Sequence, residues 1–125
     1  MICRLLPIAL AVLCASPPVE GVALRVIDGD TVAVGERRIR LMGLDAPEAR
    51  GAKCPREKIL GVAAKLRLAA LTASPERVRL EPSGRRDRYG RELARLLVDG
   101  RDVATILIGE GLAHPYSGGR RQGWC

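Results

Sequence analysis

The feature that most constrains the fold of this chain is the order of its apolar segments. Apolar and polar residues alternate in several short runs, which is the pattern of half-buried strands. Between the third and the fourth of these runs lies a longer segment, in which apolar side chains recur at helical spacing. The strands are expected at residues 22–27, 31–34, 37–42, 78–80 and 93–98, and the long helix at residues 55–73.

Two helices are predicted. Pro55 suits the first turn of the long helix, and Glu57 favours its positive end. A second, short helix is expected over residues 103–110, with Asp102 as its N-cap and Gly111 as its terminator. The buried face of the long helix is expected to consist of Ile59, Val62, Ala63, Leu66, Ala69, Ala70 and Ala73.

Five short strands, a long helix between strands 3 and 4 and a short helix after strand 5 give the order of an OB-fold. We therefore expect an α+β chain with a five-stranded OB-fold barrel over residues 22–125. OB-folds often bind nucleic acids, but a fold alone does not assign a function.

The composition favours a polyanionic partner. Of the 21 basic residues 18 are Arg, and the formal net charge is +7. An alternative is that the Arg content reflects genome composition. The single histidine, His114, argues against Ser-His-Asp catalysis and against a multi-histidine zinc site. Three aromatic side chains are too few for rows of stacked bases.

Residues 1–21 have the features of a cleavable signal peptide. Arg4 precedes an apolar run of 11 residues, which is too short to span a bilayer, and Ala15 is a plausible cleavage position. This predicts a periplasmic or secreted protein. Two alternatives are a lipid anchor on Cys14 and an uncleaved strand of the core.

Removal of a signal would leave two cysteines, Cys54 and Cys125. A disulfide between them is expected in an oxidising compartment, the alternative being two unrelated thiols. It would close a loop of about 70 residues, which chain-entropy arguments value at roughly 4 kcal/mol.

Carboxylates cluster in two segments. Asp28 and Asp30 flank a glycine at a strand interruption, and Asp45 and Glu48 follow the third strand, which ends near Arg40. Closely spaced carboxylates can hold a hard cation, whereas taken alone the segments could be an ordinary Asp-Gly turn and a solvated loop.

Residues 85–91 carry four arginines around Tyr89. Arginine binds phosphate bidentately, although such a charge run can also be a solvated loop. Phosphodiester hydrolysis needs a base, cations for the charged transition state and often a metal. Across the three segments these parts are Glu48 as base, Arg40 with Arg91 as cations, and Asp30 with Asp45 as metal ligands.

The chain resembles the staphylococcal-nuclease-like (thermonuclease) family over residues 22–116. The motifs that carry the resemblance lie at residues 26–31, 39–48, 87–94 and 109–113. It implies an OB-fold barrel and calcium-dependent endonuclease cleavage of DNA and RNA phosphodiesters.

The resemblance also implies roles for individual residues. Glu48 is the general base, and Arg40 and Arg91 stabilise the pentavalent phosphate. Calcium is bound by Asp30, Asp45 and the backbone carbonyl of Ala46, with Asp28 acting through water. Arg88 and Tyr89 contact a nucleotide phosphate, and Tyr116 matches an aromatic ring.

Two positions and one segment depart from the family pattern. Ala46 replaces a threonine and Arg88 a lysine, and the long C-terminal helix is missing. We expect residues 116–125, held by the disulfide, to take the place of that helix, and His114 to be structural. The signal features and the resemblance together predict an exported hydrolase, expected to be monomeric and without stable membrane association after signal removal. The alternative is a catalytically silent OB-fold that binds nucleic acid or another anionic partner.

Overall fold

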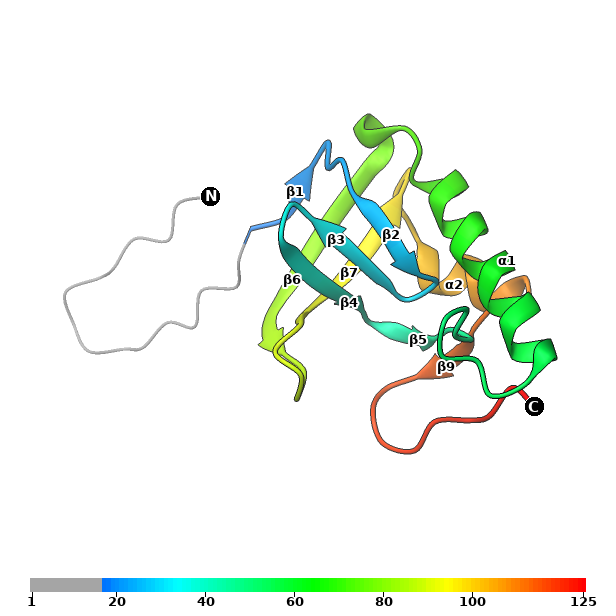
Figure 1. The fold of residues 1–125 in the computed structure, drawn as a ribbon. Helices are drawn as coiled ribbons and strands as arrows, with labels where there is room; N and C mark the ends of the chain where they lie inside the picture. The colour runs from blue at the N-terminus through cyan, green and yellow to red at the C-terminus, as the bar shows by residue number, and fades with distance from the viewer. Residues whose placement is uncertain (1–16) are drawn as a thin grey trace.

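The structure is a computed structural model that describes residues 17–125 (Figure 1). The expected signal features at residues 1–16 lie outside the described residues. Seven strands form one sheet and two form a second: β1 (Val19–Glu20), β2 (Arg25–Asp28), β3 (Thr31–Val34), β4 (Arg37–Leu41), β6 (Val78–Arg86), β7 (Glu92–Val98) and β8 (Arg101–Asp102), then β5 (Gly43–Asp45) with β9 (His114–Tyr116).

The larger sheet has the strand order β1-β6-β7-β4-β3-β2, with β8 beside β7. Among the strands of residues 17–125, only β4 and β7 of this sheet pair in parallel. The five predicted strands correspond to β2, β3, β4, β6 and β7, and their order is OB-like. The predicted count of five was wrong, because four additional strands of only two or three residues are present.

A closed barrel was also predicted, and the hydrogen-bond ladder of the described residues does not close. Its edge strands β1 and β2 belong to one stretch of chain that changes partner between them. β1 pairs with β6 and β2 pairs with β3, so the sheet curls around the core without a complete ring (Figure 1).

The core is aliphatic, as the scarcity of aromatic residues requires. Inward positions of the strands and one face of each helix supply it. Its most fully buried apolar side chains are those of Val32, Ile39, Leu41, Leu44, Leu68, Val78, Leu80, Leu96, Val103 and Leu107. This core fixes β3, β4 and β5, whose polar ends build the site described below.

The long helix α1 (Pro55–Leu71) packs beside β2 (Figure 1). Its predicted apolar face was wrong, because Ile59 is 70% exposed and Leu66 is 63% exposed. The buried face is instead formed by Glu57, Gly61, Ala64 and Leu68. Small side chains at two of these positions let the helix approach the sheet and its loops closely, and their low hydrophobicity hides this face from a periodicity search.

The second helix, α2 (Val103–Gly109), begins where Asp102 caps it through the N–H of Ala104 at 2.9 Å. Over residues 17–125, neither helix combines the length and the apolar character that crossing a membrane requires.

The predicted disulfide between Cys54 and Cys125 is present, with the two Cα atoms 6.0 Å apart. It joins the end of the chain to the residue that caps α1. Figure 1 shows the C-terminal tail leaving β9, looping outward and returning to the start of α1.

Candidate active site

The first acidic element of the site is the turn between β2 and β3. A bulge follows Val26 and places Asp28 opposite Thr31, so that Asp28 and Asp30 flank Gly29. A Cβ atom on Gly29 would lie 2.8 Å from the Cβ atoms of both Ala46 and Ala64. Glycine therefore lets this turn pack between the β5 loop and α1.

Asp30 is held in place by two donors. Its Oδ2 accepts the backbone N–H of Ala46 at 2.8 Å, and its Oδ1 accepts the hydroxyl of Thr31 at 3.0 Å. The side chain is buried. The bond from Ala46 connects the β2–β3 turn to the loop after β5, so the two acidic segments of the sequence meet.

Arg40 lies at the centre of the site and is 9% exposed. Its Nη1 donates to the backbone carbonyls of Leu41 at 2.8 Å and Leu44 at 2.9 Å. Its Nη2 lies 3.5 Å from a carboxylate oxygen of Asp30 and 3.5 Å from one of Asp45. The carbonyl bonds fix the guanidinium, and the two acids balance its buried charge.

Asp45 is the most buried acid of the site, with a side chain 2% exposed. Burial raises the pKa of its carboxyl, an effect that the nearby Arg121 opposes. Burial also raises the pKa of Asp28, and repulsion from Asp30 and Glu48 adds to this. The Oδ2 atom of Asp45 is buried and has no hydrogen-bond partner within residues 17–125. A buried carboxylate oxygen of this kind is an available ligand for a cation.

Glu48 lies on the loop between β5 and α1, with a side chain 42% exposed. The buried Glu57 of α1 holds this loop: its carboxylate accepts the backbone N–H of Glu48 at 3.2 Å and that of Lys53 at 2.8 Å. The bond from Lys53 is the main reason that the pKa of Glu57 is lowered. Gly61 lets the loop lie directly on the helix, since a Cβ there would be 2.5 Å from the N atom of Ala49.

The basic element is the loop before β7. Asp87 organises it by accepting the backbone N–H groups of Tyr89 and Arg91, each at 2.9 Å, and the Nε of Arg91 at 2.6 Å. Tyr89 is 69% exposed, and the guanidinium of Arg88 lies 4.9 Å from the centre of its ring. This loop presents cations to solvent and is held mainly by bonds within itself.

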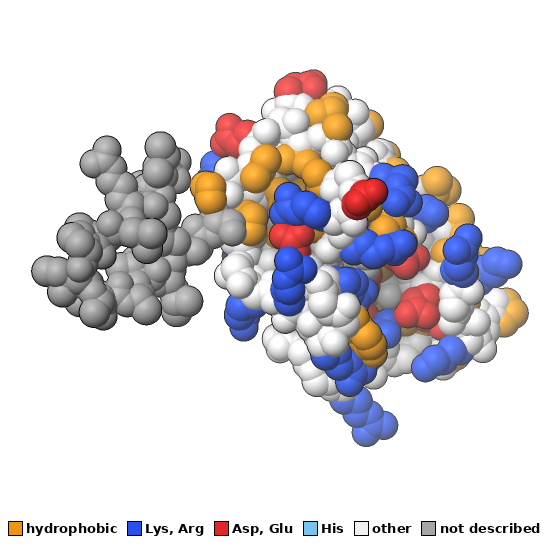
Figure 2. Space-filling model, turned by 60° about the vertical axis from the view of Figure 1, so that its left-hand side comes forward, with side chains coloured by type: hydrophobic (Ala, Val, Ile, Leu, Met, Phe, Trp, Pro, Cys, Tyr) orange, Lys and Arg blue, Asp and Glu red, His pale blue; other side chains and the backbone are white. Residues whose placement is uncertain are grey.

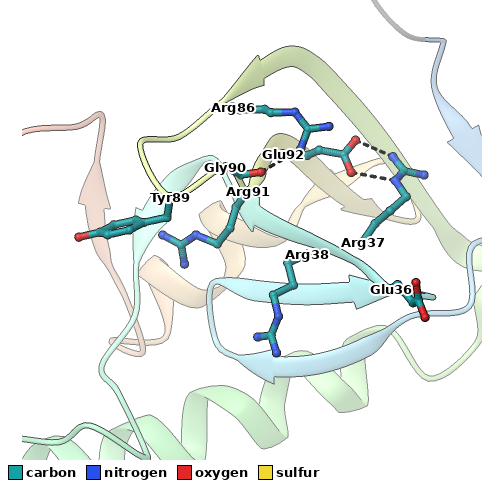
Figure 3. Close-up of a pocket in the computed structure, with 8 residues that line it drawn as sticks. All are labelled: Glu36, Arg37, Arg38, Arg86, Tyr89, Gly90, Arg91 and Glu92. Atoms are coloured by element: carbon teal, nitrogen blue, oxygen red, sulfur yellow. Dashed lines mark hydrogen bonds and ion pairs between the residues drawn. The ribbon is translucent and has the colours of Figure 1, made fainter.

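Residues of this loop also line a hollow that they share with the start of β4 (Figure 3). There Arg37 is paired with Glu92 at 2.7 Å, and Arg86 donates to the carbonyl of Gly90 at 2.8 Å. No ion pair of Arg38 is found in the described part of the chain, and its guanidinium extends from β4 on the same side of the sheet as that of Arg91 (Figure 3). The hollow therefore extends the basic surface next to the acids.

One cleft brings most of the predicted site residues together. Its walls include Asp28, Asp30, Arg40, Glu48, Arg88, Tyr89, Arg91 and Tyr116. Asp45 borders this group through Arg40, and Ala46 is buried through its bond to Asp30. Figure 2 shows acidic side chains in a hollow of the surface that Lys and Arg side chains border.

Sequence reasoning missed two features of the site. One is the presence of Arg121, and the other is the role of Glu57 in holding the loop that carries Glu48. Arg121 lines the same cleft and contacts Asp45. Its signal in the sequence was its position four residues before Cys125, which was expected to bond to Cys54, close to the loop that carries Glu48. Glu57 stands three residues after the helix N-cap, where a carboxylate commonly reaches back to backbone N–H groups.

Within residues 17–125, no three Asp, Glu, His or Cys side chains gather closely enough to hold a metal ion by themselves. A metal here would be bound by two carboxylates together with backbone carbonyl and water oxygens. Calcium accepts such mixed oxygen ligands.

The chain is similar in sequence to a known protein family and to proteins named as endonucleases. Residues 38–122 match the family described as staphylococcal nuclease homologue. The chain is 33% identical over 93 residues to the endonuclease YncB of Bacillus subtilis, covering 71% of this chain and 44% of that protein. It is 31% identical over 93 residues to the SPbeta prophage-derived endonuclease YokF of the same species, covering 71% and 31%.

A third relative carries a different kind of name. The succinoglycan biosynthesis protein ExoI of Rhizobium meliloti is 38% identical over 109 residues, covering 79% of this chain and 53% of that protein. The chain thus spans about half or less of the length of each of these relatives. The family match covers most of the chain and includes Arg40, Asp45, Glu48 and Arg91. The chain belongs to the staphylococcal nuclease homologue family.

Proposed function

We propose that this protein is an exported, calcium-dependent endonuclease that hydrolyses phosphodiester bonds of DNA or RNA. The observation that carries the proposal is the buried Arg40, 3.5 Å from both Asp30 and Asp45 in a cleft that Glu48 and Arg91 also line. Acids that could bind a cation and arginines that could bind a phosphate thus share one cleft.

The residues present fit a calcium ion. The unpartnered Oδ2 of Asp45 is a hard oxygen ligand, and the carboxylates of Asp30 and Asp45 each lie 3.5 Å from the same Nη2 atom of Arg40. Asp30, Asp45 and the carbonyl of Ala46 would hold the ion, with Asp28 acting through water. When bound, a calcium ion would bind the phosphate and offset its negative charge.

The proposed chemistry of the chain's own residues follows from their positions. Glu48 is exposed enough to reach a water molecule and would take its proton as that water attacks phosphorus. As the new P–O bond forms, the bond from phosphorus to one sugar oxygen would break, and the leaving oxygen would take up a proton from water. Arg40 is fixed by two carbonyls and would meet the charge that develops on the phosphate oxygens, together with Arg91. Preorganised donors of this kind need no rearrangement when the charge appears.

The exposed residues of the cleft would bind the rest of the strand. Arg88 and Tyr89 project from the basic loop and would contact a neighbouring phosphate. Tyr116 lies beside Arg40, whose guanidinium carbon is 5.7 Å from the centre of its ring, and it would pack against the nucleotide.

Export is part of the proposal. The Cys54–Cys125 disulfide is typical of an oxidising compartment, and residues 1–21 would direct the chain there. Cell fractionation with an antibody against residues 22–125 tests this. If the proposal is correct, the protein that has lost its signal segment will be found outside the cytoplasm.

A protein that only binds nucleic acid is the second candidate, favoured by the net charge of +7. One experiment separates the two. Purified protein is incubated with DNA and with RNA, in calcium or in excess chelator, and both binding and chain length are measured. Cleavage that requires calcium supports the proposed function, whereas binding without cleavage in either condition supports the second candidate. Full cleavage in chelator would remove the metal from the proposal.

A further inference from the structure

The C-terminal tail, residues 117–125, is attached to the domain at several points. The Tyr116 hydroxyl at its start donates to the carbonyl of Gly119 at 3.0 Å. Near its end Trp124 stacks on His114, with ring centres 3.7 Å apart. Cys125 is bonded to Cys54 at the start of α1. The tail therefore follows a fixed path along the cleft.

This path brings Arg121 to the acids. Its Nε donates to Oδ1 of Asp45 at 2.9 Å, and its Nη1 lies 3.6 Å from Oε1 of Glu48. The neighbouring Arg120 is exposed, and no ion pair of its side chain occurs among the residues that the structure describes. Two adjacent arginines thus differ completely in their surroundings.

We propose that Arg121 is a built-in cation of the site that competes with the divalent metal for Asp45 and so sets the metal affinity. The inference rests on the proposed function, because it takes Asp45 as a metal ligand. A guanidinium 2.9 Å from that carboxylate offsets part of the negative charge that attracts the ion, and it repels the ion itself.

The disulfide determines how strongly Arg121 competes. A tail attached at Cys125 keeps the guanidinium at a high effective concentration beside Asp45. Opening the disulfide leaves the Trp124 stack as the remaining contact near the end of the tail, so Arg121 would spend less time at the site. Reduction should therefore strengthen metal binding through the same residue.

The test is calorimetric titration of the purified oxidised protein with calcium at low salt, without nucleic acid. Arg121→Gln should bind calcium about 10- to 30-fold more tightly, the effect of one full charge roughly 4–6 Å from a divalent ion at the dielectric of water. Arg121→Lys keeps the charge and should bind nearly as the wild type does. Arg120→Gln is the matched control for net charge and should leave the affinity unchanged.

The disulfide arm uses Cys125→Ser, which leaves the cap of α1 intact. This variant should also bind calcium more tightly, and adding Arg121→Gln to it should change little further. Trp124 is the chain's single tryptophan, so its fluorescence reports whether the tail is still docked in each variant. Circular dichroism confirms folding at the temperature of the titration.

The outcomes separate this inference from the proposed function. Equal calcium affinity of the wild type and Arg121→Gln, or weaker binding by Arg121→Gln, would overturn the role of Arg121 and leave the metal site standing. If neither the wild type nor any of these variants binds calcium, the metal site of the proposed function fails as well.

Discussion

The acidic and the basic halves of the cleft are built in different ways. Asp30, Arg40 and Asp45 are buried and are held by contacts that connect several strands. The basic loop is exposed, and Asp87 holds it through bonds to residues of the same loop. Groups that place a cation and a water molecule need fixed positions, whereas groups that contact a flexible polymer can adjust to it.

Within the basic loop, the comparison predicts the largest effect at Arg91, where this loop meets the acidic half. Arg91→Ala should lower turnover by roughly 10² to 10³, the typical cost of removing a preorganised donor to a developing charge. Turnover is measured at saturating substrate and fixed low salt. Arg101→Ala, an exposed change of equal charge on β8, should leave turnover unchanged. Equal losses of activity in both variants below saturation, with turnover restored in both at saturating substrate, would reduce Arg91 to part of a general basic surface.

The second prediction concerns the loop support at Glu57. Glu57→Gln should lower the free energy of unfolding by about 1–3 kcal/mol at neutral pH, because an amide replaces a buried carboxylate that accepts two backbone N–H bonds. It should also reduce turnover, since the backbone of Glu48 loses its anchor.

The pH dependence of stability has a defined sign here. The pKa of Glu57 in the folded protein lies below its ordinary value of 4.5, so its contribution is present above that value. The contribution is lost as the pH falls through the folded pKa. Chemical denaturation at neutral and acidic pH should show the wild type and Glu57→Gln converging in acid. The exposed Glu76→Gln is the control, and a constant difference at all pH values would contradict the account.

Replacing either of two helix glycines by alanine should change the free energy of unfolding, but in opposite directions. Gly61→Ala places a methyl group 2.5 Å from backbone atoms of Glu48 and Ala49, so it should destabilise the fold by about 1–3 kcal/mol. Gly109→Ala has open space and should stabilise by about 0.4–1 kcal/mol. Urea unfolding measures both. A neutral Gly61→Ala would show that the loop does not depend on close contact with α1.

The smallest effect is expected in the exposed half. Arg88→Ala should raise KM a few-fold with turnover retained, and it should lower the slope of log binding against log salt by about 1, as for one lost phosphate contact. Binding titrations at several salt concentrations provide the slope. A large loss of turnover with unchanged KM would place Arg88 in the chemistry rather than in substrate binding.

Much of this site could be predicted from sequence because its polar residues stand at strand ends. Alternating apolar residues fix the register of β3 and β4, and this register brings Asp30 and Arg40 to the same end of the sheet. The order of the five main strands along the chain was predicted correctly, because each shows this alternation of apolar residues. After residues 1–21 the sequence contains two cysteines, Cys54 and Cys125, and the disulfide predicted between them is present.

The remaining features depend on close contacts that leave little trace in hydrophobic periodicity. The buried face of α1 uses Gly61 and Ala64 where a periodicity search favours Ile59 and Leu66. The short strands β1, β5, β8 and β9 form only because longer elements place them next to a partner. Arg121 reaches Asp45 across 76 residues of sequence, which only the folded tail makes possible.

The central claim is that the fixed acidic half carries out hydrolysis in this cleft. Turnover of Glu48→Gln on DNA, measured at saturating calcium and substrate beside its binding affinity, tests that claim most directly. The account predicts a loss of roughly 10² to 10⁴ in turnover with the fold and substrate binding preserved, because Glu48 is partly exposed and lies outside the core. Wild-type turnover in a correctly folded Glu48→Gln protein would contradict it.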